Sequence, residues 1–127
     1  MGESWLILET SARGGRVGLA ADGGIAREIA LDPARRHARD LVPTAASLLA
    51  EFGLVPKSLT GVMVSVGPGS FTGLRVGVIS AKALAFATGC RLVAVPTFAA
   101  IAEMAPEECL ELDAISDGLK GLVYAQR

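Results

Sequence analysis

The sequence of 127 residues is poor in metal-binding and redox-active side chains, with one histidine and two cysteines. Cys90 and Cys109 are far apart and form no CxxC motif, so we expect two buried, reduced thiols of a cytosolic protein. One histidine and two cysteines cannot assemble a usual structural zinc site. Because His37 is the only histidine, a helix with two zinc-binding histidines, as in metalloproteases, is excluded as well.

The sequence also lacks an excess of charge of either sign, since 12 basic residues face 13 acidic ones. No overall positive field is available, so this chain alone is not expected to hold nucleic acid. No run reaches the roughly 18 apolar residues that span a bilayer. Glu3 precedes a short apolar run at the N-terminus, which differs from a signal peptide. We therefore expect a cytoplasmic protein with no membrane contact, built as a globular chain that is 51% apolar.

Glycine-containing turns divide the first third of the chain into three predicted strands. Residues 5–9 form a short apolar run, residues 16–21 a return strand, and residues 25–31 a third strand. The turns between them contain Gly14, Gly15 and the sequence Asp22-Gly-Gly. The pattern predicts three antiparallel strands.

A helical period begins at about residue 36. His37, Leu41, Ala45, Leu48, Leu49 and Phe52 recur at helical spacing, and Gly53 can end the helix. Pro43 lies inside this segment, which predicts a kink or a later helix start.

The rest of the chain alternates between predicted strands and helices. We predict helices over 72–88 and 98–104, and strands over 62–66, 91–95, 109–115 and 122–125. The complete order is β-β-β-α-β-α-β-α-β-β, which predicts an α/β fold with a mixed sheet, of the ribonuclease H-like class that includes actin-like (ASKHA) ATPases and kinases. A strand-turn-strand echo, "LILETSARGGRVGLA" and "LDAISDGLKGLVYA", suggests a lobe over 1–106 and the start of a truncated second lobe over 107–127.

The glycine-rich stretch "VSVGPGSFTGLRVG" raises two alternatives. A phosphate-binding loop is one, but Gly67 to Gly73 is followed by Leu74 and Arg75 in place of the lysine of a Walker motif. The other is structural: Gly67 and Gly69 allow a tight strand-to-helix turn, and Ser70 or Thr72 caps the helix. We favour the structural interpretation, although a helix N-terminus attracts anions in general.

The helix after this loop is apolar on nearly every side. Gly73, Gly77, Ala81 and Ala85 recur every four residues, so another backbone can approach closely along this stripe. The remaining sides carry Val76, Val78, Ile79, Leu84 and Phe86. This predicts either burial inside the domain or, as we favour, a helix-mediated protein interface.

Four segments together resemble the bacterial TsaB (YeaZ) family. They are "ILETS", "RRHARDLVPTAASLLAEFGL", "SVGPGSFTGLRVGVISAKALA" and "RLVAVPTFAAIA", and the resemblance runs from about Leu6 to Ala102. It implies a two-lobed actin-like protein that is a non-catalytic partner of the catalytic subunit TsaD in making threonylcarbamoyladenosine on tRNA. The resemblance further implies that the ATPase TsaE joins the assembly and that tRNA is met only through the complex. When the partner is absent, we expect a homodimer.

The resemblance places the partner interface on the two helices of the first lobe. The residues expected there are His37, Leu41, Ala45, Leu48, Phe52, Gly73, Val76, Gly77, Ser80, Ala81 and Leu84. Two departures from the family pattern are Glu9, where an aspartate is common, and His37-Ala38-Arg39, where the family has His-Ser-Glu.

Catalysis by this chain is not expected, and neither is a cofactor. Glu9 lies at the end of the first strand, where nucleases and actin-like kinases place an acid, but no further carboxylates converge on it. We expect Glu9 to accept backbone hydrogen bonds at the hairpin turn. Two alternatives remain: an actin-like ATP-binding enzyme, although "ETSARGG" lacks the early glycine of a DxGxT loop, and a self-associating structural protein. The basic cluster "ARRHAR" predicts a solvated helix start or a contact to tRNA within an assembly.

Overall fold

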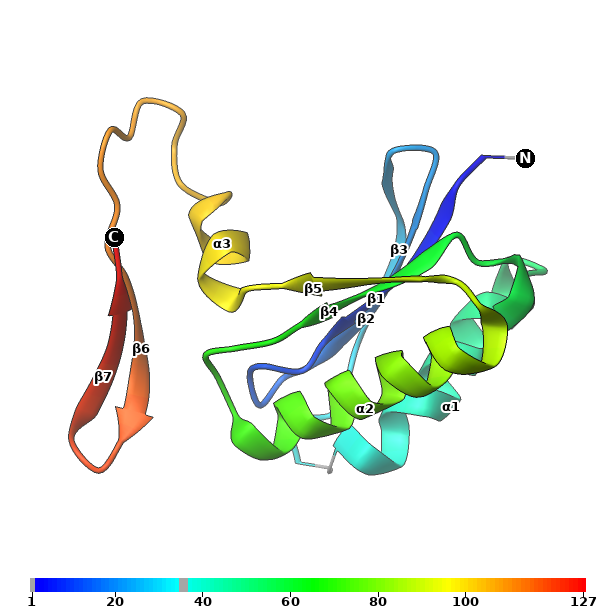
Figure 1. The fold of residues 1–127 in the computed structure, drawn as a ribbon, viewed down its shortest axis with the longest axis horizontal. Coiled ribbons are helices and arrows are strands. Elements are labelled where there is room, and N and C mark those ends of the chain that lie inside the picture. Colours follow the sequence, from blue (N-terminus) through cyan, green and yellow to red (C-terminus); the bar gives the residue numbers. More distant parts are fainter. Residues whose placement is uncertain (1, 35–36) are drawn as a thin grey trace.

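A computed structural model describes residues 2–34 and 37–127 (Figure 1). Its first three strands are β1 (Ser4–Glu9), β2 (Arg16–Ala21) and β3 (Gly24–Ala30). The β1–β2 and β2–β3 pairs are both antiparallel, as the turn residues predict. The predicted meander is therefore confirmed, with β3 beginning one residue earlier than expected.

Two further strands complete the main sheet on the other edge of β1. Strand β4 (Gly61–Ser65) pairs parallel with β1, and β5 (Arg91–Val95) pairs parallel with β4. The order is β3-β2-β1-β4-β5, which is a mixed sheet with antiparallel strands on one side and parallel strands on the other. The helices between the parallel strands make the crossovers that such pairing requires.

Two long helices cover the same face of this sheet (Figure 1). Helix α1 (His37–Glu51) is continuous through Pro43, so the alternative of a later helix start is wrong. A short 3₁₀ helix, η1 (Pro56–Ser58), leads to β4. Helix α2 (Phe71–Thr88) ends at Gly89, which adopts the left-handed conformation with φ 75° that glycine accepts without strain.

The core lies between the sheet and these two helices. Alternate residues of the strands point into it, because successive strand side chains face opposite sides of a sheet. From the helices, Leu41, Leu48 and Leu49 of α1 and Ala81 of α2 are buried against them. The strand residues of this core are Leu6, Leu8, Val17, Leu19, Val62 and Val64.

The C-terminal part is a short helix followed by a separate hairpin. Helix α3 (Thr97–Ala102) is followed by β6 (Ala114–Leu119) and β7 (Leu122–Gln126), which pair only with each other. The strand predicted over 109–115 begins later, as β6, because the Cys109 backbone N–H closes a turn by donating to the Pro106 carbonyl oxygen (2.9 Å). Cys109 is also exposed, which corrects the expectation that both thiols are buried.

Candidate functional site

The glycine loop packs directly onto the turn that follows β1. The Ser70 backbone N–H donates to the Ser11 carbonyl oxygen (2.6 Å). A Cβ added at Gly69 would lie 2.5 Å from that same oxygen, so this contact requires a glycine. The two segments are far apart in the chain, and the close approach joins the carboxyl ends of β1 and β4.

The carboxylate of Glu9 is held by hydroxyl and amide donors at this junction. Its Oε1 accepts hydrogen bonds from the Ser11 backbone N–H (2.7 Å), from the Ser11 hydroxyl, and from the Ser65 hydroxyl (3.1 Å). The Thr10 backbone N–H donates to Ser65 Oγ (3.3 Å) and ties β1 to β4. Glu9 thus accepts a backbone hydrogen bond at the hairpin turn, as expected.

Polar groups of the glycine loop form hydrogen bonds to other groups of the same chain. The Ser70 hydroxyl accepts from the Gly73 N–H (3.3 Å), so Ser70 rather than Thr72 is the N-cap of α2. The Gly67 carbonyl oxygen accepts from the Thr97 N–H (2.9 Å). Pro68 has no backbone N–H to offer. These bonds favour the structural interpretation of the loop over a phosphate cradle.

The small-residue stripe of α2 makes its close approach within the chain. Gly73, Gly77 and Ala81 are the buried residues of this helix. A Cβ added at Gly77 would lie 2.2 Å from Thr10 Oγ1 at the end of β1. The stripe therefore lets α2 lie down on the sheet. This corrects the prediction that Gly73, Gly77 and Ala81 contact a partner.

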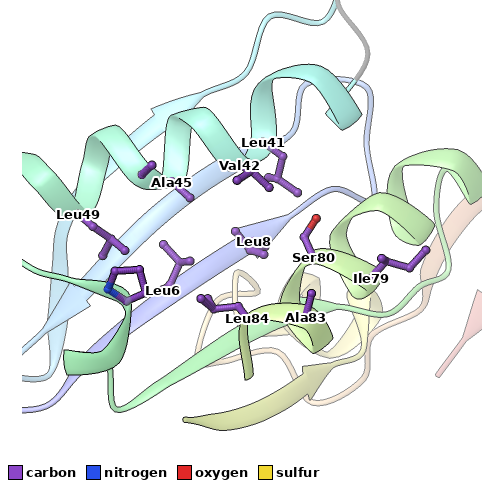
Figure 2. Close-up of a pocket in the computed structure, with 12 residues that line it drawn as sticks. Leu6, Leu8, Leu41, Val42, Ala45, Leu49, Ile79, Ser80, Ala83 and Leu84 are labelled. Carbon is purple, nitrogen blue, oxygen red and sulfur yellow. The ribbon is translucent and has the colours of Figure 1, made fainter. Parts of the chain in front are cut away.

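An apolar groove of about 360 Å³ lies between α1 and α2, on the face of the sheet that these helices cover. Figure 2 shows Leu6 and Leu8 of β1 in its interior and side chains of both helices along its sides. The helix residues that line it are Leu41, Val42, Ala45, Ala46 and Leu49 of α1, and Ile79, Ser80, Ala83 and Leu84 of α2. Ser80 is the one residue among them with a polar side chain, so the groove suits an apolar occupant.

Large apolar side chains are exposed at this groove and elsewhere along α2. Val42 and Ile79 are each 60% exposed, and Phe71 and Phe86 of α2 are 73% and 93% exposed. We call this surface, made by Val42, Phe71, Ile79 and Phe86 together with the groove, the docking face. Exposed apolar patches of this kind are typical of protein–protein contacts.

The interface residues predicted from sequence fall into three groups. Ala45, Ser80 and Leu84 line the groove, and Val76 lies beside it in a shallow depression of α2. Leu41 is largely buried but also lines the groove, whereas Leu48 is buried in the core, which corrects the predicted partner contact of Leu48. Phe52 is exposed but lies at a different depression, with Leu19 and Leu54. The side chain of His37, like residues 35–36 of the basic cluster, is outside the described residues.

The most exposed residues of the docking face were predicted only as part of broader segments. The expected contact surfaces, residues 36–52 and 72–86, contain Val42, Ile79 and Phe86, but none of these three was named as an individual contact, and Phe71 lies just outside the second range. On α2 a usable signal exists, because Arg75, Ile79, Lys82 and Phe86 are spaced by four, three and four residues and therefore share one helix face. We call these four residues the outer stripe. Its mixture of cations and apolar residues marks an amphipathic surface that the small-residue pattern concealed.

Two further observations on the described part of the chain concern metal ligands and helices long enough to cross a membrane. Within it, no three histidine, cysteine or acidic residues come together as a metal site would require. Helix α2 alone is long and apolar enough, by length and composition, to cross a bilayer. Core helices of globular proteins meet the same criterion, and the buried side of α2 packs on its own sheet.

The fold defines an actin-like α/β lobe, and comparison with known proteins gives its family. The family model described as "TsaD: tRNA N6-adenosine threonylcarbamoyltransferase" matches residues 11–127. The chain belongs to this family. Its predicted likeness to TsaB (YeaZ) proteins is confirmed by the YeaZ structure from Pseudomonas aeruginosa, which superposes with a TM-score of 0.83 at 30% identity.

The chain spans only part of each relative. The YeaZ match covers 97% of this chain and 58% of that one. TsaB from Bacillus subtilis is 32% identical over 90 residues, which are 71% of this chain and 39% of that protein. The tRNA N6-adenosine threonylcarbamoyltransferase of Erythrobacter litoralis is 40% identical over 73 residues, 58% of this chain and 20% of the relative.

Proposed function

We propose that this chain is a non-catalytic partner of a TsaD-type catalytic subunit in the threonylcarbamoyladenosine modification of tRNA. The observation that carries the proposal is the docking face, where Val42 and Ile79 of two neighbouring helices are mostly exposed beside an apolar groove. Burial of such a surface against another protein is favourable, at roughly 25 cal/mol for each Å² removed from water. The names of the similar TsaB and TsaD proteins supply the process.

The assembly that we propose has further members. Residues 1–106 form the lobe that docks, and residues 107–127 begin a second lobe. A TsaE-type ATPase joins the same complex, and tRNA is met only through it. The chain works in the cytoplasm without membrane contact, and in the absence of its partner two copies pair through the docking face.

The rival hypothesis of an actin-like ATP-binding enzyme depends on Glu9. The Oε1 of this carboxylate is already engaged by Ser11 and Ser65. The Ser70 N–H, which a phosphate at the start of α2 would need, donates to Ser11 instead. These contacts support the partner role over the enzyme.

The test is complex formation with the TsaD-type subunit of the same organism, measured by size exclusion with light scattering. The variant is Ile79→Asp, which places a charge on the docking face. Ile25→Asp is the matched control, since Ile25 on β3 is also an isoleucine with 60% exposure. We expect a 1:1 complex for the wild type and for Ile25→Asp, and none for Ile79→Asp with an unchanged melting temperature. Equal binding by all three chains, or ATP hydrolysis by a chain that binds no subunit, would contradict the proposal.

A further inference from the structure

The docking face carries positive charge that nothing on it balances. Helix α2 contains two charged residues, Arg75 and Lys82, and both are exposed and basic. They are seven residues apart, about two helical turns, and so lie on the same side as Ile79 and Phe86. Arg39 of α1 is exposed too, and its spacing of three and seven residues from Val42 and Ala46 places it on their face of the helix.

The acidic residues of α1 lie elsewhere. Asp40 precedes Val42 by two residues, which puts it about 160° around the helix from the docking face. Glu51 pairs with Arg27 of β3 (3.4 Å). Among the described residues, the ion pairs found involve none of the three cations of the docking face; they are Arg16–Glu28, Arg27–Glu51, Arg91–Glu3 and Arg127–Asp113.

Within residues 2–34 and 37–127, the one ring or charge contact found for these cations leaves their charge in place. The Arg75 guanidinium lies over the Phe71 ring, 5.5 Å from its centroid. This contact orders the Arg75 side chain but does not neutralise its charge. The chain as a whole has a net charge of -1, so the positive charge of the docking face is a local feature.

We infer that the partner for which this face is built presents carboxylates around an apolar patch, and that a second copy of the chain is the weaker occupant. The inference rests on the proposed function, because it assigns the chemistry of the protein that docks there. A two-fold pair of identical chains brings the same surface together from both sides, so the arginines and lysines of both copies converge. A partner with acidic side chains turns that repulsion into attraction.

This arrangement makes the two kinds of association respond oppositely to salt. Charges at the rim of an interface act mainly on the association rate, and added salt screens them. Binding to an acidic partner should weaken about 10-fold between about 0.05 and 0.5 M salt. Self-association should become stronger over the same range, because screening removes the repulsion between like charges.

The test compares the wild type with the double variant Arg75→Glu/Lys82→Glu. The matched control is Arg13→Glu/Lys120→Glu, which changes the net charge equally at exposed positions outside α1 and α2. Affinities for the TsaD-type subunit are measured over the salt range, and self-association by sedimentation. We expect about 10-fold weaker binding at low salt for the α2 variant only. An equimolar mixture of wild type and α2 variant should associate more tightly than either chain alone.

The outcomes separate this inference from the proposed function. If the subunit binds with no dependence on salt or on Arg75 and Lys82, while Ile79→Asp still abolishes binding, the acidic partner is wrong and the docking face stands. If the wild type prefers itself to the subunit at low salt, a second copy is the occupant. If no chain binds the subunit under any condition, the proposed function fails as well.

Discussion

Thr10 at the end of β1 and Gly77 in the middle of α2 approach each other so closely that position 77 has no room for a side chain. An ideal Cβ at Gly77 would lie 2.2 Å from Thr10 Oγ1, and Thr10 is fully buried. The helix can rest on the sheet at this point because one of the two residues is a glycine. The contact sets the distance between the layers beneath the docking face.

Gly77→Ala is therefore expected to destabilise the protein. The substitution improves helix propensity by about 1 kcal/mol, but overpacking a core typically costs about 1–3 kcal/mol, and this contact belongs at the upper end. We expect a net loss of about 1–2 kcal/mol in the free energy of unfolding, measured by urea denaturation. Gly24→Ala is the control, because nothing lies within 4 Å of a Cβ added there. If the double variant Gly77→Ala/Thr10→Ala regains the lost free energy of unfolding, the loss is due to this pair. If it is as unstable as Gly77→Ala alone, the loss has another cause.

Leu48→Ala should act on stability although Leu48 was predicted to contact a partner. Its side chain is 0% exposed within this chain, and truncation of a buried leucine costs about 2–5 kcal/mol. Phe86→Ala removes a larger side chain that is 93% exposed, so we expect a change within about 0.5 kcal/mol. Thermal unfolding of both variants measures the contrast. Similar losses for the two would mean that α2 is covered in the free chain.

Ser70→Ala should weaken the start of α2. It removes the oxygen that accepts from the Gly73 N–H, and loss of an N-cap costs about 0.5–2 kcal/mol. Thr72→Ala, two residues later on the exposed side, is expected to change stability little. Urea denaturation of the two variants decides between the cap residues. A larger loss for Thr72→Ala would show that the helix begins later.

Glu9→Ala is expected to loosen the junction of β1 and β4. The substitution leaves the Ser11 N–H and two hydroxyls without their acceptor, and hydrogen bonds to a charged group contribute about 1.5–3 kcal/mol. Glu9→Gln keeps an acceptor oxygen and should lose less. Hydrogen exchange of the Ser11 amide reports the change directly. Unaltered exchange and stability in Glu9→Ala would show that this carboxylate is free for another role.

The strands of the main sheet were predictable because local signals agree there. Tight turns at Asp22-Gly-Gly, the β-branched run Val62–Val66 and the residues around Arg91 each specify a strand whose neighbours follow from chain order. Helix α1 was likewise marked by its period. The alternative of a helix that starts after Pro43 was wrong, since α1 is continuous through this proline.

The errors arose where one pattern fits two environments. Residues 109–113 alternate apolar and acidic side chains like a strand, yet Leu110 is 97% exposed and pairing begins only at Ala114, the first residue of β6. The stripe of Gly73, Gly77 and Ala81 signals close approach but not which backbone approaches. That answer depended on Thr10, far away in sequence, so the pattern alone did not show that the outer stripe, rather than the small-residue stripe, is the surface left exposed.

The position of β1 in the middle of the sheet has a consequence for synthesis on the ribosome. Its pairing with β2 can form as soon as the first hairpin has emerged, whereas its other edge waits for β4, which follows the whole of α1. During that interval the nascent chain presents an unpaired edge beside the apolar residues Leu6 and Leu8. Such an edge pairs readily with other chains, so emergence of this protein is a step at which chaperones would act.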